Sequence, residues 1–135
     1  MIKEFGRFRI KYRKGTCDEY ILKHQSFRND IFFKGVSDNY TPKSNDTIID
    51  IGAHIGTFSI LAASKLKKGK VYAIEASKNT FDYLEANVSL NNISNISPCN
   101  LALTNFQGTA KLFHDLENGN WGNTITAGIS KDYEE

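Results

Sequence analysis

The stretch DTIIDIGAHIGTFSILAASKLKKGKVYAIE, residues 46–75, decides the fold of this 135-residue chain. Residues 47–51 form a β-branched run without polar alternation, which is typical of a parallel strand covered on both faces. Residues 52–56 break that run with two glycines, and the apolar spacing that follows suits a helix. A basic turn and Gly69 mark the end of this helix, and residues 70–75 form a second strand directly after it. The order of these elements predicts an α/β domain.

The same alternation of elements continues towards the C-terminus. Ser77 suits the N-cap of a second helix, and residues 95–103 read as a third strand. The apolar stripe of that helix is Phe81, Leu84 and Val88. Connections of this kind are right-handed, so we expect three parallel strands with the first at one edge of the order.

The N-terminal residues have a different character. Residues 5–13 alternate between apolar and basic side chains, as in a half-buried strand. The apolar side is Phe8, Ile10 and Tyr12, and the basic side is Arg7, Arg9, Lys11 and Arg13. Residues 19–24 and 30–34 read as further short strands. Residues 1–45 are therefore predicted to be an antiparallel, β-rich segment.

The whole chain is predicted to be a single domain in three parts. Residues 46–107 form a Rossmann-like core, which follows the β-rich segment of residues 1–45. Residues 108–135 are predicted to form a β-hairpin, from residues 108–113 and 123–126, and a tail.

Composition narrows the class of protein. Hydrophobic residues make up 40% and charged residues 24% of the chain, which is typical of a soluble globular domain. A net charge of +2 does not by itself indicate a polyanionic partner. Cys17 and Cys99 belong to no metal-ligand spacing, so no metal is expected. The chain begins without the apolar core of a signal peptide, and the expected localisation is cytoplasmic, with no membrane partner.

The glycine turn lies where a parallel strand passes into a helix, the place at which open α/β sheets bind ligands. Gly52 lets the backbone approach a ligand, and Gly56 lets the helix begin close to the strand. The helix N-terminus suits a carboxylate, and Asp50 at the end of the strand suits an ammonium group. The turn can therefore receive both ends of an amino-acid moiety.

Glu75 ends the second strand, where an acidic side chain can accept hydrogen bonds from both ribose hydroxyls of an adenosine-containing cofactor. A nicotinamide or flavin site would need glycines where this chain has His54 and Thr57. A P-loop is excluded because Ser64 stands where its first glycine belongs. A tight turn that binds no ligand remains the alternative.

Several segments of the core carry a family resemblance in their order and spacing. They are DIGAHIGTFS at 50–59, VYAIEAS at 71–77, residues 84–93, residues 101–103, Gly108 and residues 122–124. These segments resemble the FkbM family of S-adenosylmethionine-dependent methyltransferases. The resemblance implies a Rossmann-like class I methyltransferase fold and S-adenosylmethionine as cofactor. It also implies methyl transfer to a hydroxyl oxygen of a small molecule or glycan.

The resemblance further implies the residues of the cofactor site. They are Asp50, Gly52, Ala53, Gly56, Glu75, Ala76 and Ala102, the last of them near the adenine. A hydroxyl acceptor benefits from a general base, for which His54 in the glycine turn and His114 after the third strand are candidates. The alternatives are a packing role for His54 and a surface position for His114.

Members of the family continue past the hairpin with further sheet elements, so we expect an incomplete sheet here. The open edge of the first strand, residues 47–51, predicts a homo-oligomer through that edge. An inactive, truncated methyltransferase-like protein that acts as a binding or oligomerisation module is the alternative function. An RNA methyltransferase that uses the basic N-terminal strand is a third hypothesis, although nucleic acid is not the favoured partner.

Overall fold

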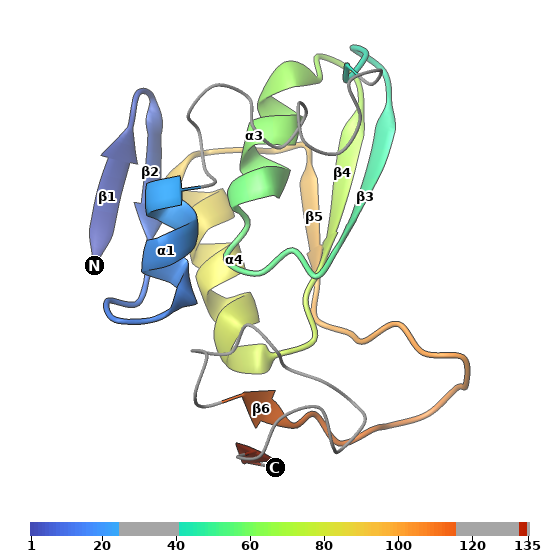
Figure 1. Cartoon of the computed structure of the whole chain (residues 1–135). Helices are drawn as coiled ribbons and strands as arrows, with labels where there is room; N and C mark the ends of the chain where they lie inside the picture. Colours follow the sequence, from blue (N-terminus) through green and yellow to red (C-terminus); the bar gives the residue numbers. More distant parts are fainter. Residues whose placement is uncertain (25–40, 116–132, 135) are drawn as a thin grey trace.

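The computed structural model describes residues 1–24, 41–115 and 133–134 (Figure 1). A three-stranded parallel sheet in the order β3-β4-β5 lies at its centre. Its strands are β3 (Thr47–Ile51), β4 (Lys70–Ile74) and β5 (Ile96–Cys99), joined by helices α3 (Thr57–Lys65) and α4 (Lys78–Leu90). The predicted α/β, Rossmann-like architecture is confirmed, and β3 lies at one edge of the order as expected.

Local capping explains where the helices begin and end. Ser77 is the N-cap of α4, as predicted, and its side chain accepts the backbone N–H of Thr80 at 3.5 Å. After α3, the backbone N–H of Gly69 donates to the carbonyl of Ser44 at 2.9 Å. A Cβ at position 69 would lie 2.1 Å from the carbonyl oxygen of Asp46, so only glycine fits this close approach.

The two helices cover one face of the sheet (Figure 1). Each strand is added on the same side of the preceding one, and right-handed connections therefore place α3 and α4 on a common face. Their buried side chains form the core with those of the strands and with Ile55 of the loop before α3. The helix and strand residues are Ile60, Val71, Ala73, Phe81 and Leu84. On β3, Ile49 and Ile51 are 61% and 65% exposed. The expectation of a strand covered on both faces is therefore wrong within the described residues.

The N-terminal segment begins with an antiparallel hairpin of β1 (Ile2–Phe5) and β2 (Phe8–Lys11). The predicted alternation is confirmed within β2, because Ile10 is fully buried while Arg9 and Lys11 are exposed. The single strand predicted over residues 5–13 is wrong outside β2, because Gly6 and Arg7 form the hairpin turn and the Arg13 side chain is largely buried in an ion pair with Asp18.

The strand predicted at residues 19–24 is wrong, because Cys17–His24 forms helix α1. The hydroxyl of Thr16 accepts the backbone N–H of Asp18 at 3.2 Å, and acidic residues occupy the first turn. Asp18 and Leu22, one helical turn apart, are both buried. The strand predicted at residues 30–34 lies outside the described residues.

Two asparagines, Asn87 on α4 and Asn91 at its C-cap, attach the hairpin to the α/β core. Oδ1 of Asn87 accepts the backbone N–H of Lys11 at 2.6 Å, and its Nδ2 donates to the carbonyl of Lys11 at 3.0 Å. Asn91 pairs with the backbone of Arg9 in the same reciprocal way, at 2.8 and 2.7 Å. The side-chain amides therefore continue the hydrogen-bond ladder at the outer edge of β2.

The part after β5 is less regular than predicted. The third strand ends at Cys99 instead of residue 103, and residues 108–112 belong to no strand. A short β6 (His114–Asp115) pairs with β7 (Tyr133–Glu134), and the other predicted hairpin strand, 123–126, lies outside the described residues. None of the described helices is long and apolar enough to cross a membrane.

Candidate cofactor site

The loop between β3 and α3 is fastened to the end of β4. The backbone N–H groups of Gly52 and Ala53 both donate to the carbonyl of Ile74 at 2.9 Å. The backbone angle φ is positive at alternate positions, with values of 75° at Gly52, 53° at His54 and 86° at Gly56. Glycine adopts this left-handed conformation without strain, whereas His54 adopts it at an energetic cost. The loop therefore holds a fixed shape that its sequence only partly favours.

Gly56 also sets the start of α3. It is the N-cap of the helix and offers no side-chain acceptor to the first turn. A Cβ at this position would meet Cδ1 of Leu84 at 2.6 Å, so glycine brings α3 close to α4. A helix N-terminus without a capping side chain suits the carboxylate of a ligand.

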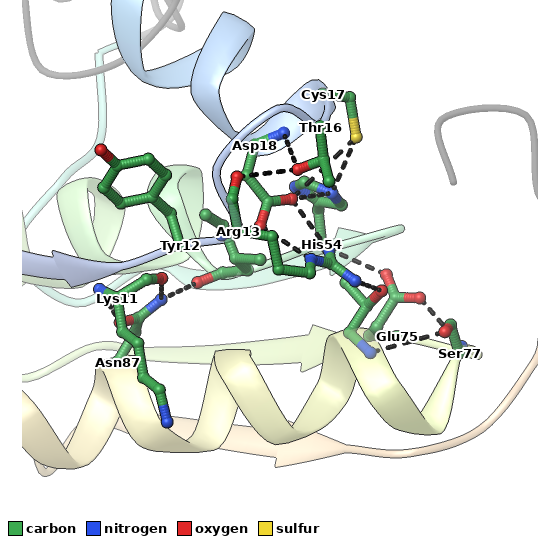
Figure 2. A network of polar contacts seen from close by, with 12 residues as sticks. Lys11, Tyr12, Arg13, Thr16, Cys17, Asp18, His54, Glu75, Ser77 and Asn87 are labelled. Carbon is green, nitrogen blue, oxygen red and sulfur yellow. Dashed lines mark hydrogen bonds and ion pairs between the residues drawn. The ribbon is translucent and has the colours of Figure 1, made fainter. Parts of the chain in front are cut away.

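Glu75 follows β4 and its carboxylate is held by backbone N–H groups from two sides (Figure 2). Its Oε2 accepts the N–H of His54 and its Oε1 accepts the N–H of Ser77, each at 2.9 Å. The side-chain amide of Asn100 donates to the carbonyls of Glu75 and Ala76 at 2.9 and 3.1 Å. The loop, the start of α4 and the segment after β5 thus converge on this residue.

Asp50 is the second acidic group at this end of the sheet. Its Oδ2 accepts the hydroxyl of Ser59, on the first turns of α3, at 2.5 Å. Burial raises the pKa of Asp50, and the negative charge of Glu75 raises it further, against the opposing effect of the Ser59 hydrogen bond. Two carboxylates that repel each other favour a cationic ligand close to both of them.

The structure thus brings five of the seven predicted cofactor residues together at the ends of β3 and β4. They are Asp50, Gly52, Ala53, Gly56 and Glu75. Ala76 directly follows Glu75 and is half-buried, and Ala102 is exposed in the segment after β5.

The side chain of His54 points away from this site, towards α1 (Figure 2). Its Nε2 lies 3.1 Å from Oδ1 of Asp18 and 3.5 Å from Sγ of Cys17. Burial lowers the pKa of His54, but the contacts with Asp18 and Cys17 outweigh burial and raise the pKa to about 9. The imidazole is therefore protonated at neutral pH, a state that does not suit a general base. His114 lies in β6 opposite Glu134, and its catalytic role stays a prediction.

Arg13 and Asp18 complete a polar cluster that the sequence did not reveal. Nε and Nη2 of Arg13 donate to the two oxygens of Asp18 at 2.8 Å, and its Nη1 donates to Thr80 at 3.2 Å. Burial raises the pKa of Asp18, but the hydrogen bonds from His54 and Arg13 outweigh it and hold the pKa well below its usual range. The only local signal is the acid five residues after the arginine, across the Gly15 turn.

One ligand atom each from Cys17, Asp18 and His54 lies within 4.8 Å of the other two, a spacing that could suit a metal ion. Both oxygens of Asp18 already accept from the guanidinium of Arg13, whose positive charge would repel a cation. We therefore interpret the cluster as an ion-pair network rather than a metal centre.

Comparison with known proteins identifies the family to which the chain belongs. Residues 38–114, more than half of the chain, match the family model of the TRM5/TYW2 methyltransferase domain. The chain belongs to the TRM5/TYW2 methyltransferase domain family. The prediction of a methyltransferase domain is confirmed at this level, and the predicted cofactor, S-adenosylmethionine, is the one that the TRM5/TYW2 family uses. The narrower FkbM assignment is not supported.

Two relatives of this TRM5/TYW2 domain act on tRNA. A tRNA (guanine(37)-N(1))-methyltransferase from Heterostelium pallidum is 39% identical over 66 residues, which are 49% of this chain and 15% of the relative. A tRNA(Phe) (4-demethylwyosine(37)-C(7)) aminocarboxypropyltransferase from Methanocaldococcus jannaschii is 36% identical over 59 residues, 44% of this chain and 24% of the relative. The match spans less than a quarter of either relative. The expected small-molecule or glycan acceptor, with no nucleic acid, is contradicted by these relatives.

A solved structure shows the fold of the TRM5/TYW2 domain independently. Coclaurine N-methyltransferase bound to N-methylheliamine and SAH aligns with a TM-score of 0.50 over 75% of this chain and 27% of that chain. The sequence identity of 18% limits this likeness to the fold.

Proposed function

We propose that this chain is the cofactor-binding part of an S-adenosylmethionine-dependent tRNA methyltransferase. The observation that carries the proposal is the pair of carboxylates beside the glycine loop, Asp50 on β3 and Glu75 directly after β4. The raised pKa of Asp50 reflects buried negative charge, which the ammonium and sulfonium charges of the cofactor would neutralise.

Each predicted cofactor residue has a role in this proposal. Asp50 receives the ammonium group, and the open start of α3 at Gly56 receives the carboxylate. Glu75 accepts the ribose hydroxyls. The remaining contacts come from Gly52, Ala53, Ala76 and Ala102.

Calorimetric titration with S-adenosylhomocysteine tests the site. Asp50→Asn and Glu75→Gln remove one charge each and keep the shape of the side chain, and we expect each to weaken binding by about tenfold or more. Glu85→Gln, the same change on an exposed residue of α4, is the matched control and should bind like wild type. Wild type that gives no binding heat would refute the cofactor proposal for this chain.

A basic surface that leads towards the site from the far end of α4 supports tRNA as the acceptor. Arg9 and Lys11 lie beside Asn91 and Asn87, and Arg13 lies beside Thr80, so β2 runs towards the start of α4 and Glu75. The exposed cations along this path are Lys3, Arg7, Arg9, Lys11 and Lys14. Such cations bind phosphates by releasing counterions from RNA.

Filter binding of tRNA over a range of salt concentrations tests this surface. We expect an Arg9→Gln, Lys11→Gln double variant to bind more weakly and to reduce the slope of log affinity against log salt by about 1–2. The control is Lys67→Gln, Lys68→Gln, which removes the same charge beyond the opposite end of α3. Equal losses in both double variants would mean that net charge, and not this surface, drives binding.

Aminocarboxypropyl transfer from the same cofactor is a second candidate, favoured by the match to the M. jannaschii aminocarboxypropyltransferase. The two reactions break different bonds at the sulfonium. Methyl transfer leaves S-adenosylhomocysteine, whereas aminocarboxypropyl transfer leaves 5′-methylthioadenosine. Chromatography of the nucleoside product after incubation with tRNA separates them, and we expect S-adenosylhomocysteine.

A further inference from the structure

Asp18 joins helix α1 to the glycine loop through His54. The carboxylate of Asp18 is fully buried, and its Oδ1 lies 3.1 Å from Nε2 of His54. Arg13 binds the same carboxylate through Nε and Nη2, and its backbone N–H donates to Oδ2, all at 2.8 Å. Asp18 is therefore fixed between a guanidinium and an imidazole (Figure 2).

The contact with Asp18 holds a backbone conformation that His54 does not favour. The φ angle of 53° lies in the left-handed region, where a side chain crowds the backbone. Residues in this region keep their conformation only where surrounding contacts impose it. For His54 the side-chain contacts come from Asp18 and Cys17 on α1, a part of the chain outside the cofactor motif, and they add to the backbone hydrogen bond with Glu75.

The conformation of His54 in turn positions Glu75. It directs the N–H of His54 at Oε2 of Glu75, while Ser77 at the start of α4 holds Oε1. With one oxygen fixed from the loop and the other from α4, the carboxylate has a single orientation. Release of His54 would leave the carboxylate fastened at Oε1 alone.

We propose that Asp18 and Arg13 are positioning residues of the cofactor site, which hold His54 so that Glu75 is oriented towards the ribose. This inference rests on the proposed function, in which Glu75 accepts the ribose hydroxyls. It adds a requirement that the glycine loop alone does not contain: the site is complete only when α1 is docked against the loop.

A double-mutant cycle tests the link. Asp18→Asn keeps the shape of the side chain but weakens its hold on His54, and we expect S-adenosylhomocysteine to bind about tenfold more weakly. Because Asp18 acts through Glu75, the Asp18→Asn, Glu75→Gln double variant should bind no more weakly than Glu75→Gln alone. Additive losses would overturn the proposal. Glu19→Gln, on the same helix but bonded to Gly15 and Lys23, is the matched control and should bind like wild type.

An NMR measurement without cofactor separates this inference from the proposed function. The amide proton of His54, bonded to a carboxylate in wild type, should move upfield in Asp18→Asn and stay in place in Glu19→Gln. That shift would support the positioning role even if wild type failed to bind S-adenosylhomocysteine, a failure that would refute only the proposed function. An unchanged His54 amide would overturn the inference.

A second pair of variants keeps the Arg13–Asp18 ion pair intact and avoids a buried unpaired charge. His54→Ala and His54→Gly both lose the contact with Asp18, but only glycine adopts a positive φ without strain. We expect His54→Gly to bind S-adenosylhomocysteine several-fold more tightly than His54→Ala. Equal affinity of the two variants and wild type would overturn the proposal, because the conformation at position 54 would then not matter for binding.

Discussion

Asn87 on α4 binds both main-chain groups of Lys11 on β2, at 2.6 and 3.0 Å, and its Nδ2 also donates to the carbonyl of Ile55 at 2.8 Å. Asn87 is fully buried, its contact with Ile55 is buried, and its contacts with Lys11 are partly buried. One side chain therefore connects the N-terminal hairpin, helix α4 and the loop of the cofactor site.

Loss of this amide should destabilise the chain strongly. Asn87→Ala leaves buried backbone groups without partners, and we expect a loss of roughly 3 kcal/mol in the free energy of unfolding. Asn91→Ala removes the equivalent, more exposed contact with Arg9 and should cost about 1 kcal/mol. Urea unfolding measures both, with Asn79→Ala on the exposed face of α4 as control. Similar losses for Asn87→Ala and Asn79→Ala would refute the connecting role.

Stability should depend on pH through His54. Its pKa is about 9 in the fold and 6.5 in a free histidine, so its contribution to stability is complete below pH 6.5 and is lost as the pH rises through 9. The difference corresponds to roughly 3 kcal/mol of unfolding free energy as an upper value. Unfolding at pH 6 and pH 10 should show this loss in wild type but not in His54→Asn. Parallel pH curves for the two proteins would contradict the assignment.

The pKa of Asp18 is lowered, so Asp18 also stabilises the fold, but its contribution changes with pH in the opposite direction to that of His54. It is complete above the usual carboxylate range and is lost as the pH falls below it. We expect the Asp18–His54 contact to contribute most between about pH 5 and pH 6.5. At pH 6 we expect a lower unfolding free energy for Asp18→Asn than for wild type. This difference in unfolding free energy should become smaller as the pH is lowered from 6 to 2. A difference in unfolding free energy that stays constant over this pH range would mean that the charge of Asp18 does not contribute to stability.

Local patterns predicted the sheet and its two helices because each of these elements is decided by its own residues. The β-branched run before Gly52, the Ser77 cap and the apolar stripe of α4 all act within a few positions. The strand predicted over residues 19–24 was wrong because the apolar residues of this short segment fit both the two-residue period of a strand and the period of a helix. In the structure the segment is helical, with Asp18 and Leu22 buried one turn apart. Ile49 and Ile51 are exposed because the strand order places both helices on the other face of the sheet. The sequence of a single strand does not reveal this order.

The candidate site divides in the same way. Asp50, Gly52, Gly56 and Glu75 could be predicted because turn chemistry and strand ends place them. The hydrogen bonds from Asp18 to His54 and from Asn87 to Lys11 join residues far apart in the sequence, so neither spacing nor composition marks them. The basic side of the N-terminal strand was visible in the sequence, but the small net charge gave it too little weight, and the predicted partner was wrong.

Asp50→Asn should separate binding from stability. The pKa of Asp50 is raised, so its ionised form destabilises the ligand-free fold, and this cost grows as the pH rises through the folded pKa. Asparagine removes the charge and can still accept the Ser59 hydroxyl, so we expect the unfolding free energy at pH 7 to rise by about 1 kcal/mol. Calorimetry on the same variant should show weakened S-adenosylhomocysteine binding. A variant that loses both stability and binding would indicate a structural role for the charge.

Three glycines should respond to alanine in a defined order. At Gly69 a Cβ would lie 2.1 Å from a backbone oxygen, and we expect Gly69→Ala to cost about 3 kcal/mol. At Gly56 an added Cβ would meet the flexible end of Leu84, and φ is positive. We therefore expect Gly56→Ala to cost roughly 2 kcal/mol of unfolding free energy. At Gly52 a Cβ would meet nothing within 4 Å, so the cost is the backbone strain alone, about 1 kcal/mol.

The open space at Gly52 makes this variant the informative one for function. If the cofactor approaches the backbone there, Gly52→Ala should lose most of its affinity for S-adenosylhomocysteine although it is the most stable of the three. Urea unfolding and calorimetry on the same samples give both quantities. Gly52→Ala that binds like wild type would show that the ligand does not lie against this part of the loop, and Asp50 and Glu75 would then have to hold it from the other side.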